Sequence, residues 1–342
     1  MSIKLTKMPQ KILIVKPSSL GDIIHSLPFL GAIREAFPAA AIDWVVAEGF
    51  EGLLDSHPMV NRVWIVRKDR WKEAGNLPET LAEWSGLARD LAAVRYDLAI
   101  DLQGLLRSGL LTMFTRAPVR VGLSEAREGA PLFYTHRVEG GRDRHAVDRY
   151  LGVAGALGAD IARVNFPLPL VRPSAEVEEL LAQTGPYAVI VPGARWQSKK
   201  WPAELFAKVA SRLPLPSIVV GSRADSGIGE QIAASSAGKA RSMAGKTTLK
   251  DLIPLMRKAA FVVTNDSGPM HLAAAAGVPV IALFGPTNPV RTGPYGTGHR
   301  VLTANLPCAP CYKKECRNPR CMTGISVDEV CKTVTTLLEE GR

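Results

Sequence analysis

The chain has 342 residues, of which 46% are hydrophobic and 22% charged, with a formal net charge of +10. This length exceeds one ordinary hydrophobic core and fits two domains. The sequence has no apolar run of 18 residues and no secretory signal in its first ten residues, so we expect a cytoplasmic protein. The positive charge predicts an acidic partner. The basic residues are dispersed and carry no RNA-binding or helix-turn-helix signature, which argues against nucleic acid.

Short β-branched runs alternate with helical patterns along the first half of the chain. The expected strands are Ile12–Val15, Ile42–Val46, Val63–Val66, Leu98–Leu102 and Val119–Val121. The expected helices are Ile23–Phe37, Leu77–Val94 and His145–Leu157. This βαβ rhythm predicts a parallel sheet covered by helices on both faces.

The prolines between Asn165 and Pro173 indicate a linker, after which the rhythm restarts. Strands are expected at Tyr187–Val191, Ile218–Val220, Phe261–Thr264 and Val280–Leu283, and helices at Ala203–Leu213, Leu249–Lys258 and Met270–Ala276. We therefore predict one domain over residues 1–165, a second over residues 166–325 and a terminal helix within residues 326–342. Ligands of doubly wound sheets bind beyond the carboxyl ends of the strands.

The first candidate site is the segment Lys16-Pro-Ser-Ser-Leu-Gly-Asp22, which follows a buried strand and opens a helix. Asp22 falls in the first helical turn, where the helix dipole and nearby N–H groups favour its ionised form. A carboxylate placed there can act as a general base. The alternative is that Asp22 and Ser19 only cap the helix, and the residues alone leave both open. His25, on the same helix face, is expected to be a partly exposed polar residue.

The second candidate site, Asn265-Asp-Ser-Gly-Pro-Met-His271, repeats this pattern in the second half. Asp266 or Ser267 is expected to cap a helix, and the N–H groups around Gly268 and His271 form an anion site suited to a diphosphate. The next strand ends in a similar turn, Phe284–Pro289. Either turn alone is explained by ordinary capping, but two on neighbouring strands favour a ligand site.

A third segment, Pro192–Pro202, carries cationic residues after the first strand of the second half. Arg195 and Lys199 can supply positive charge to a departing diphosphate, although solvated loop charges are the alternative. By contrast, Gly245-Lys-Thr247 only resembles the end of a phosphate-binding P-loop. The required earlier glycine is Ala240, and no apolar strand is expected before it.

Four of the five cysteines crowd one stretch with the spacing C-x2-C-x4-C-x4-C: Cys308, Cys311, Cys316 and Cys321. This spacing can hold zinc or an iron–sulfur cluster, but it lacks the paired C-x2-C knuckles of common zinc sites. A reducing cytoplasm also disfavours disulfides. A thiol-rich structural loop is therefore favoured over a metal site, and we assign no metal ligand or cofactor.

Together these motifs resemble those of the ADP-heptose:lipopolysaccharide heptosyltransferases, which form glycosyltransferase family 9. The resemblance covers nearly the whole chain, and its most specific pieces are Lys16–Asp22, Asp101–Gly104, Lys199–Pro202, Asn265–His271 and Phe284–Pro289. It implies the GT-B fold, with two Rossmann-like doubly wound α/β domains facing across a cleft. It also implies metal-independent, inverting transfer of heptose from ADP-heptose to the inner core of lipopolysaccharide.

The resemblance assigns a role to each matching residue. Asp22 takes the position of the proposed base, and Lys199 takes that of the lysine that binds the donor diphosphate. Further donor-binding positions fall on Asp225, Thr247, Asp266, Ser267, Gly268 and His271, with Asp225 at the heptose hydroxyls and Thr247 at the adenosine.

Two neighbouring threonines of some family members are Ala194 and Arg195 here. We assign these two residues to the donor site as well, but the replacement changes the contacts that their loop can make with the donor.

The acceptor implied by the resemblance is an anionic lipid. The N-terminal half is more similar to the members that add the first heptose, to Kdo2-lipid A, whereas the cysteine stretch is more similar to those that add the second, and we favour the first. Small residues of the first motif and arginines of the first half are candidate acceptor contacts: Ser19, Gly21, Arg67, Arg70, Arg107 and Arg120. Solvated surface is the alternative for each arginine.

A lipid acceptor implies peripheral contact with the anionic cytoplasmic face of the inner membrane. Two rival functions stay open: another GT-B reaction, such as nucleotide-sugar epimerisation, and a non-catalytic protein that docks on acidic membranes. No carboxylate pair marks a hydrolase, and no Asp-x-Asp motif suggests a divalent ion between phosphates.

Overall fold

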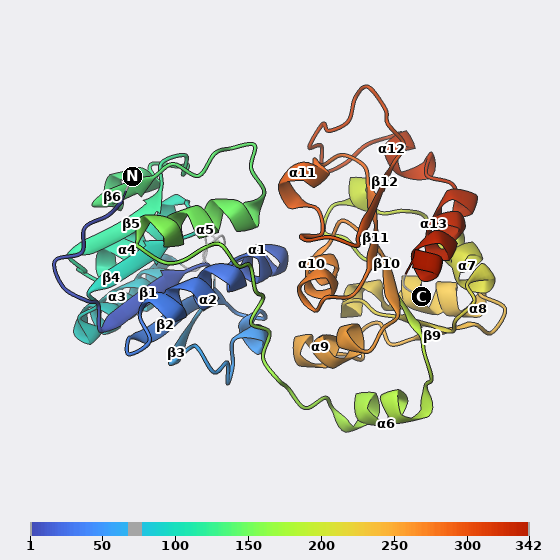
Figure 1. Ribbon diagram of the computed structural model, residues 1–342, viewed down its shortest axis with the longest axis horizontal. Helices are drawn as coiled ribbons and strands as arrows, with labels where there is room; N and C mark the ends of the chain where they lie inside the picture. The colour runs from blue at the N-terminus through green and yellow to red at the C-terminus, as the bar shows by residue number, and fades with distance from the viewer. Residues whose placement is uncertain (1, 68–76, 341–342) are drawn as a thin grey trace. The chain divides into compact units, whose positions relative to one another are not determined.

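The structure, a computed structural model, describes residues 2–67 and 77–340 (Figure 1). The chain divides into two units, Met1–Pro169 and Leu170–Arg342. The boundary therefore falls at the second proline of the expected linker, at residue 169 rather than 165. The terminal helix is part of the second unit, because its Val330, Val334 and Leu337 are buried in the core of that unit.

Each unit is built on one six-stranded sheet in which all neighbouring strands are parallel. The first sheet has the order β3-β2-β1-β4-β5-β6 and consists of β1 (Lys11–Val15), β2 (Ala41–Ala47), β3 (Arg62–Val66), β4 (Leu98–Asp101), β5 (Val119–Leu123) and β6 (His136–Val138). The second has the order β12-β11-β10-β7-β8-β9 and consists of β7 (Ala188–Val191), β8 (Ser217–Val219), β9 (Ala240–Ser242), β10 (Phe261–Asn265), β11 (Val280–Phe284) and β12 (Arg300–Thr303). Numbered from its own first strand, each sheet has the Rossmann order 3-2-1-4-5-6.

Helices cover both faces of each sheet, as expected for parallel strands (Figure 1). The first unit contains α1 (Leu20–His25), α2 (Leu27–Ala36), α3 (Leu77–Val94), α4 (Leu106–Phe114) and α5 (Ala146–Ala156). The second contains α6 (Ala175–Gln183), α7 (Ala203–Arg212), α8 (Ser226–Ala234), α9 (Leu249–Arg257), α10 (Gly268–Ala275), α11 (Pro289–Thr292), α12 (Arg320–Thr323) and α13 (Val327–Glu340). Among the described residues, no helix has the length and hydrophobicity that crossing a bilayer requires.

Both cores form because the central strands are apolar on both faces. Every residue of β10 is buried, and four of the five residues of β1 are buried. In the second unit, Trp201 packs edge-to-face on Phe206 with ring centres 4.9 Å apart and donates its indole N–H to the carbonyl of Ile325. This hydrogen bond satisfies the polar atom of a buried indole, so Trp201 can anchor the loop after β7 in the core.

One sequence expectation about secondary structure is wrong, and three short strands were not expected. The segment expected as one helix over Ile23–Phe37 is two helices, because the chain turns at Ser26 and restarts with Pro28 in the first turn of α2. The short edge strands β6 and β12 were not expected, because neither has an apolar run. Nor was β9, which ends at Ser242 and does lead towards Gly245.

Candidate functional site

The candidate motifs follow the central strands of both sheets. Strand order reverses between β1 and β4 in the first unit and between β7 and β10 in the second. In a doubly wound sheet, the loops that leave such a pair of strands diverge, so backbone and side chains can reach a ligand there. Lys16–Asp22 follows β1, and Asp101–Gly104 begins at the end of β4. Pro192–Pro202 and Asp266–His271 follow β7 and β10.

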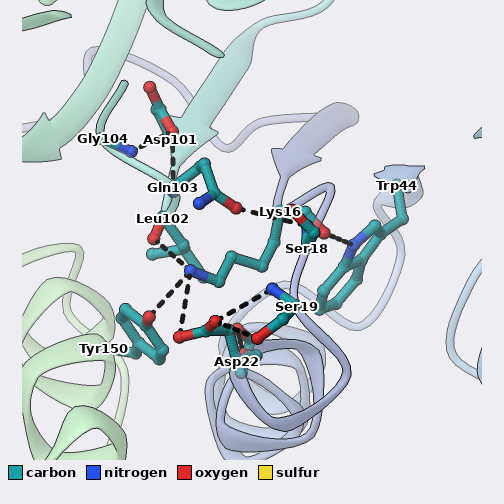
Figure 2. A network of polar contacts seen from close by, with 11 residues as sticks. Lys16, Ser18, Ser19, Asp22, Trp44, Asp101, Leu102, Gln103, Gly104 and Tyr150 are labelled. Carbon is teal, nitrogen blue, oxygen red and sulfur yellow. Dashed lines mark hydrogen bonds and ion pairs between the residues drawn. The ribbon is translucent and has the colours of Figure 1, made fainter. Parts of the chain in front are cut away.

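Asp22 lies in the first turn of α1 and does cap that helix. Its Oδ2 accepts hydrogen bonds from the backbone N–H and the hydroxyl of Ser19, at 2.9 and 2.7 Å. The side chain nevertheless stays 39% exposed, and its Oδ1 is directed to the other side, towards Lys16 (Figure 2). Capping and a role as base are therefore compatible, because Oδ2 accepts both hydrogen bonds from Ser19.

Lys16 is a buried cation beside this carboxylate. Its Nζ donates to the carbonyl of Leu102 at 3.0 Å and to the hydroxyl of Tyr150 at 2.9 Å, and it lies 3.9 Å from Asp22 Oδ1 (Figure 2). Although burial by itself would lower the pKa of Lys16, interaction with Tyr150 and Asp22 raises it above the ordinary value. The ammonium is therefore charged at neutral pH. The sequence motif contained Lys16, but nothing local to it indicated this contact.

The segment Asp101–Gly104 shapes the loop beside Asp22. Asp101 is fully buried; it accepts hydrogen bonds from the N–H groups of Gln103 and Gly104 at 2.8 and 2.9 Å and from the hydroxyl of Tyr134 at 2.7 Å. Burial raises the pKa of Asp101, while these hydrogen bonds act in the opposite direction. The turn that they fix presents the Leu102 carbonyl to Lys16 and the Gln103 amide oxygen to the N–H of Ser18 (Figure 2).

His25 is buried, so the expectation of a partly exposed side chain is wrong. Its ring lies edge-to-face against His145, with ring centres 5.0 Å apart. His145 is the N-cap of α5, the helix that also carries Tyr150. This contact packs the end of α1 against the start of α5, which keeps Tyr150 and Asp22 on one side of the first sheet.

The expected acceptor residues occupy different places in the first unit. Ser19 and the buried Gly21 belong to the start of α1. Arg67 directly follows β3 and Arg107 lies in the first turn of α4, so both are near the carboxyl edge of the sheet and both are exposed. The guanidinium of Arg67 lies 3.5 Å from Glu48.

Neither of the other two candidate arginines, Arg120 and Arg70, can be added to Arg67 and Arg107. Arg120 is near the amino end of β5, and its guanidinium donates to the carbonyls of Phe133 and Ala117, both at 2.8 Å. This arrangement favours a structural role for Arg120 over acceptor binding. Arg70 lies outside the described residues.

In the second unit, Lys199 forms a close ion pair with Asp266. Lys199 Nζ is 2.6 Å from Asp266 Oδ2 and 4.6 Å from the ring centre of Trp196. The Asp266 carboxylate is only 5% exposed and also accepts a hydrogen bond from Thr287 at 2.6 Å, whereas the Lys199 side chain is 17% exposed. Lys199 is therefore held in place, and the structure brings together three of the sequence segments singled out above.

Asn265 is a further residue of this candidate site, and sequence reasoning included it in a motif without assigning it a role. It is fully buried; its amide nitrogen donates to the carbonyl of Pro192 at 2.7 Å, and its amide oxygen accepts from the N–H of Trp201 at 3.2 Å. These bonds join the loop after β7 to the end of β10. A buried amide that crosslinks two loops leaves no periodic signal in the sequence.

The start of α10 is arranged as expected for an anion site. Ser267 is the N-cap residue, one of the two candidates expected for that position, although its side chain makes no capping hydrogen bond. Gly268 is the first helical residue, and His271, in the same first turn, is buried. The first N–H groups of a helix have no partner within it and attract anions.

Asp225 and Thr247 lie in the segments that follow β8 and β9, at the carboxyl edge of the second sheet. A Cβ at Gly193 would lie 2.6 Å from Asp225 Oδ2, so only glycine lets the loop after β7 approach this carboxylate. Ala194 and the exposed Arg195 follow directly in that loop. The hydroxyl oxygen of Thr247 is buried and has no hydrogen-bond partner among the described residues.

The cysteine stretch packs near the loop that carries Lys199. Ser198 donates two hydrogen bonds, from its N–H to the carbonyl of Lys314 at 3.2 Å and from its hydroxyl to the carbonyl of Lys313 at 2.6 Å. All five cysteines are free thiols. Burial, followed by the neighbouring thiols, raises the pKa of Cys321. Among the residues that the structure describes, no group of three or more histidine, cysteine or acidic side chains is arranged to hold a metal ion.

The chain is similar to known glycosyltransferases along most of its length. The model of glycosyltransferase family 9 (heptosyltransferase) matches residues 84–322. Lipopolysaccharide heptosyltransferase 1 of Pseudomonas aeruginosa is 37% identical over 320 residues, which cover 90% of this chain and 87% of that protein. Lipopolysaccharide heptosyltransferase 2 of Salmonella typhimurium is 30% identical over 315 residues, covering 85% and 87% of the two chains.

Solved structures agree with the sequence comparison. Escherichia coli heptosyltransferase WaaC with ADP matches with a TM-score of 0.77 at 28% identity, over 96% of this chain and 99% of that one. WaaC with ADP-2-deoxy-2-fluoro heptose matches with the same TM-score, over 95% and 99%. These similarities, together with two parallel Rossmann-like sheets and the motifs at their carboxyl edges, place the chain in glycosyltransferase family 9, the heptosyltransferases, as a glycosyltransferase of the GT-B fold.

Proposed function

We propose that this glycosyltransferase moves L-glycero-D-manno-heptose from ADP-heptose to the Kdo region of lipopolysaccharide, with Kdo2-lipid A as acceptor. The observation that carries the proposal is that each unit presents one half of the required chemistry at its strand-order reversal. The first unit offers a partly exposed carboxylate, Asp22, and the second offers a fixed ammonium, Lys199, beside a helix N-terminus. The higher identity to a heptosyltransferase 1 than to a heptosyltransferase 2 supports the choice of acceptor.

In the proposed reaction, Asp22 acts as the general base. Its carboxylate removes the proton from an acceptor hydroxyl while the hydroxyl oxygen attacks the anomeric carbon of heptose. The bond between that carbon and the diphosphate oxygen of ADP breaks in the same displacement, which inverts the anomeric configuration. The products are the glycoside, ADP and a protonated Asp22, which returns its proton to solvent. A base held by a helix cap is already oriented for this step.

The departing ADP carries growing negative charge on its diphosphate, and the second unit supplies positive charge to it. We assign Lys199 and the N–H groups at the start of α10, with His271, to the diphosphate. Asp225 is assigned to the heptose hydroxyls, and the unpartnered hydroxyl of Thr247 to the nucleoside. Because these groups already provide the cationic environment, we propose that transfer does not require a metal ion.

The first unit is accordingly the acceptor-binding domain, and the second binds the nucleotide sugar. The acceptor lipid is anionic, and the net charge of +10 favours contact with it and with an anionic membrane surface. We propose that the enzyme works in the cytoplasm, peripherally bound to the inner membrane. Arg67 and Arg107 are our candidates for contacting the acids of the acceptor, since both are exposed near the carboxyl edge of the first sheet.

The decisive experiment measures ADP release from ADP-heptose with three acceptor conditions. Kdo2-lipid A should support turnover, whereas lipid that already carries the first heptose, and buffer without lipid, should not. Turnover only with the heptosylated lipid would identify a heptosyltransferase 2 instead. Donor conversion without any lipid would contradict transfer and support epimerisation or hydrolysis. Vesicle binding without ADP release under all three conditions would indicate a non-catalytic protein.

A further inference from the structure

Capping does not distinguish Asp22 from other carboxylates of the chain. Asp225 accepts hydrogen bonds from the N–H and hydroxyl of Ser222 at 3.0 and 2.6 Å. Asp251 accepts the same pair of bonds from Thr248, both at 2.8 Å. Each therefore repeats the arrangement of Asp22 with Ser19, and a special role for Asp22 needs a different physical cause.

That cause is the buried ammonium of Lys16. Lys16 Nζ lies 3.9 Å from Asp22 Oδ1. Within the described ranges 2–67 and 77–340, no lysine or arginine nitrogen is within ion-pair distance of Asp225 or Asp251. An opposite charge at such a distance favours the ionised carboxylate. The pairing therefore separates Asp22 from the two carboxylates that share its capping geometry.

The position of Lys16 is determined by three separate parts of the first unit. The residue directly follows β1, its ammonium donates to the carbonyl of Leu102 after β4, and it donates to the hydroxyl of Tyr150 on α5. The Lys16 side chain is 3% exposed, so it has little freedom to move. Burial raises the pKa of Tyr150, which keeps this phenol neutral and able to accept a hydrogen bond from the ammonium. A buried cation is costly unless its donors are used.

We propose that Lys16, held by Tyr150, is a positioning residue that keeps Asp22 ionised and directs Oδ1 towards the acceptor hydroxyl. This inference rests on the proposed function of Asp22 as base. Lys16 touches no substrate in this scheme and acts only through the carboxylate. Tyr150 acts indirectly, because its hydroxyl accepts a hydrogen bond from the Lys16 ammonium and holds it in place.

Several other titratable groups surround Asp22. They come from the strand ends and helices around it: Lys16 after β1, Asp101 at the end of β4, His25 on α1, and Tyr150 with Arg149 on α5. Lys16 is the cation of this set for which the structure gives a direct contact with the Asp22 carboxylate. Removing the charge of Lys16 should therefore change the pH dependence of turnover.

The test uses Lys16→Met, which keeps most of the side-chain length but removes the charge, in the full-length enzyme with ADP-heptose and Kdo2-lipid A. We expect kcat to fall on the order of 10- to 100-fold, as for a displaced catalytic group. The acidic limb of the kcat profile should move upward by about one pH unit or more. KM for ADP-heptose and the affinity for ADP should stay within about twofold of wild type, because the donor residues are in the other unit. Tyr150→Phe should shift both readouts in the same direction by less.

Lys11→Met is the matched control, since Lys11 is an exposed lysine at the other end of β1 whose ammonium donates to Val94. It should leave kcat and the pH profile unchanged. Wild-type kcat and an unmoved acidic limb in folded Lys16→Met would overturn the inference. If Lys16→Met does not fold, Tyr150→Phe decides by the same two readouts.

Asp22→Asn alone and combined with Lys16→Met separates this inference from the proposed function. If Lys16 acts through Asp22, the double variant is no slower than Asp22→Asn. A large loss in Asp22→Asn with normal Lys16→Met leaves the base assignment intact and contradicts the role of Lys16. Normal turnover in Asp22→Asn contradicts the proposed function itself. If the fold reduction of kcat in the double variant, relative to wild type, equals the product of the two single reductions, Lys16 acts independently of Asp22.

Discussion

Each unit carries a lysine–aspartate pair at the strand-order reversal of its sheet, but the burial of the two pairs is opposite. In the first unit, Lys16 is 3% exposed and Asp22 39% exposed, and the charged atoms are 3.9 Å apart. In the second, Asp266 is 5% exposed and Lys199 17% exposed, at a distance of 2.6 Å. The buried partner is a cation in one pair and an anion in the other.

The difference teaches how one fold can present either a base or a cation at the same topological position. A buried ion must use its hydrogen-bonding capacity inside the protein. Lys16 does so with Leu102 and Tyr150, and Asp266 does so with Thr287. The more exposed partner is then held by the buried one and keeps a side towards solvent. On this view, Asp22 and Lys199 are the members of the pairs that act on the substrates, and Lys16 and Asp266 hold them in position.

The largest expected effect is on turnover in Asp22→Asn. Asparagine keeps the size of aspartate and most of its capping ability, but it cannot accept a proton at neutral pH. Because general base catalysis contributes about 10²–10⁴-fold, kcat should fall within that range. Steady-state kinetics with saturating donor measures kcat, and calorimetry with ADP should show unchanged affinity. A sharp fall in melting temperature with normal activity per folded molecule would identify Asp22 as a helix cap only.

The next largest effect is on donor use in Lys199→Met and His271→Ala. A hydrogen bond to a charged group contributes about 1.5–3 kcal/mol, which corresponds to roughly a 10- to 150-fold loss of ADP affinity. Lys199→Met also leaves the buried Asp266 carboxylate without its cation, so Lys199→Met with Asp266→Asn should recover stability but not affinity. Lys200→Met, at the neighbouring position, is the control and should bind ADP normally. Unchanged ADP affinity and turnover in both test variants would contradict the diphosphate assignment.

A smaller effect, on stability alone, is expected for Asp251, a capping aspartate that has no lysine within ion-pair distance among the residues that the structure describes. Although burial by itself would raise the pKa of Asp251, hydrogen bonds from the N–H groups of Ser174 and Thr248 lower it below its ordinary value of 3.8. The carboxylate therefore stabilises the fold above this value, and its contribution is lost as pH falls through the lower folded-state pKa. Asp251→Ala should cost about 1–2 kcal/mol at pH 7.

Urea unfolding at pH 7 and at pH 3 measures this contribution. The difference between wild type and Asp251→Ala should shrink at the lower pH, while kcat per folded molecule at pH 7 stays unchanged. A loss of turnover comparable to that of Asp22→Asn would show that helix capping by itself supports catalysis. The distinction between a catalytic Asp22 and a merely capping Asp251 would then be contradicted.

The smallest expected effect is that of metal removal. If Lys199 and the N-terminus of α10 provide the positive charge for the diphosphate, excess EDTA should change the rate by less than about twofold. The measurement is ADP release before and after chelation. A loss of activity that only Mg²⁺ or Mn²⁺ restores would contradict this assignment of the positive charge.

Local patterns of the sequence determined the main elements of the fold. The apolar β-branched runs predicted β1, β2, β3, β7 and β11. Helical periodicity predicted α3 with its observed bounds and placed α13 within residues 326–342. These elements could be predicted because a strand buried on both faces gives a short continuous apolar run. A helix buried on one face repeats its apolar residues with the helical period. The strand-turn-helix motifs located Asp22 and the start of α10 for the same reason. The resemblance of the motifs to family 9 was confirmed by the sequence and structure comparisons.

Only the tertiary structure decided which of these residues act together. Lys16 meets Tyr150 across 134 positions of the sequence and Leu102 across 86, and Asn265 meets Pro192 across 73. No local period reports such contacts, because they arise when parallel strands place distant loops at one sheet edge. The short strands β6, β9 and β12 depend on their neighbours in the same way. The reversal of burial between the two lysine–aspartate pairs follows from the side chains that surround each pair, which lie far apart in the sequence.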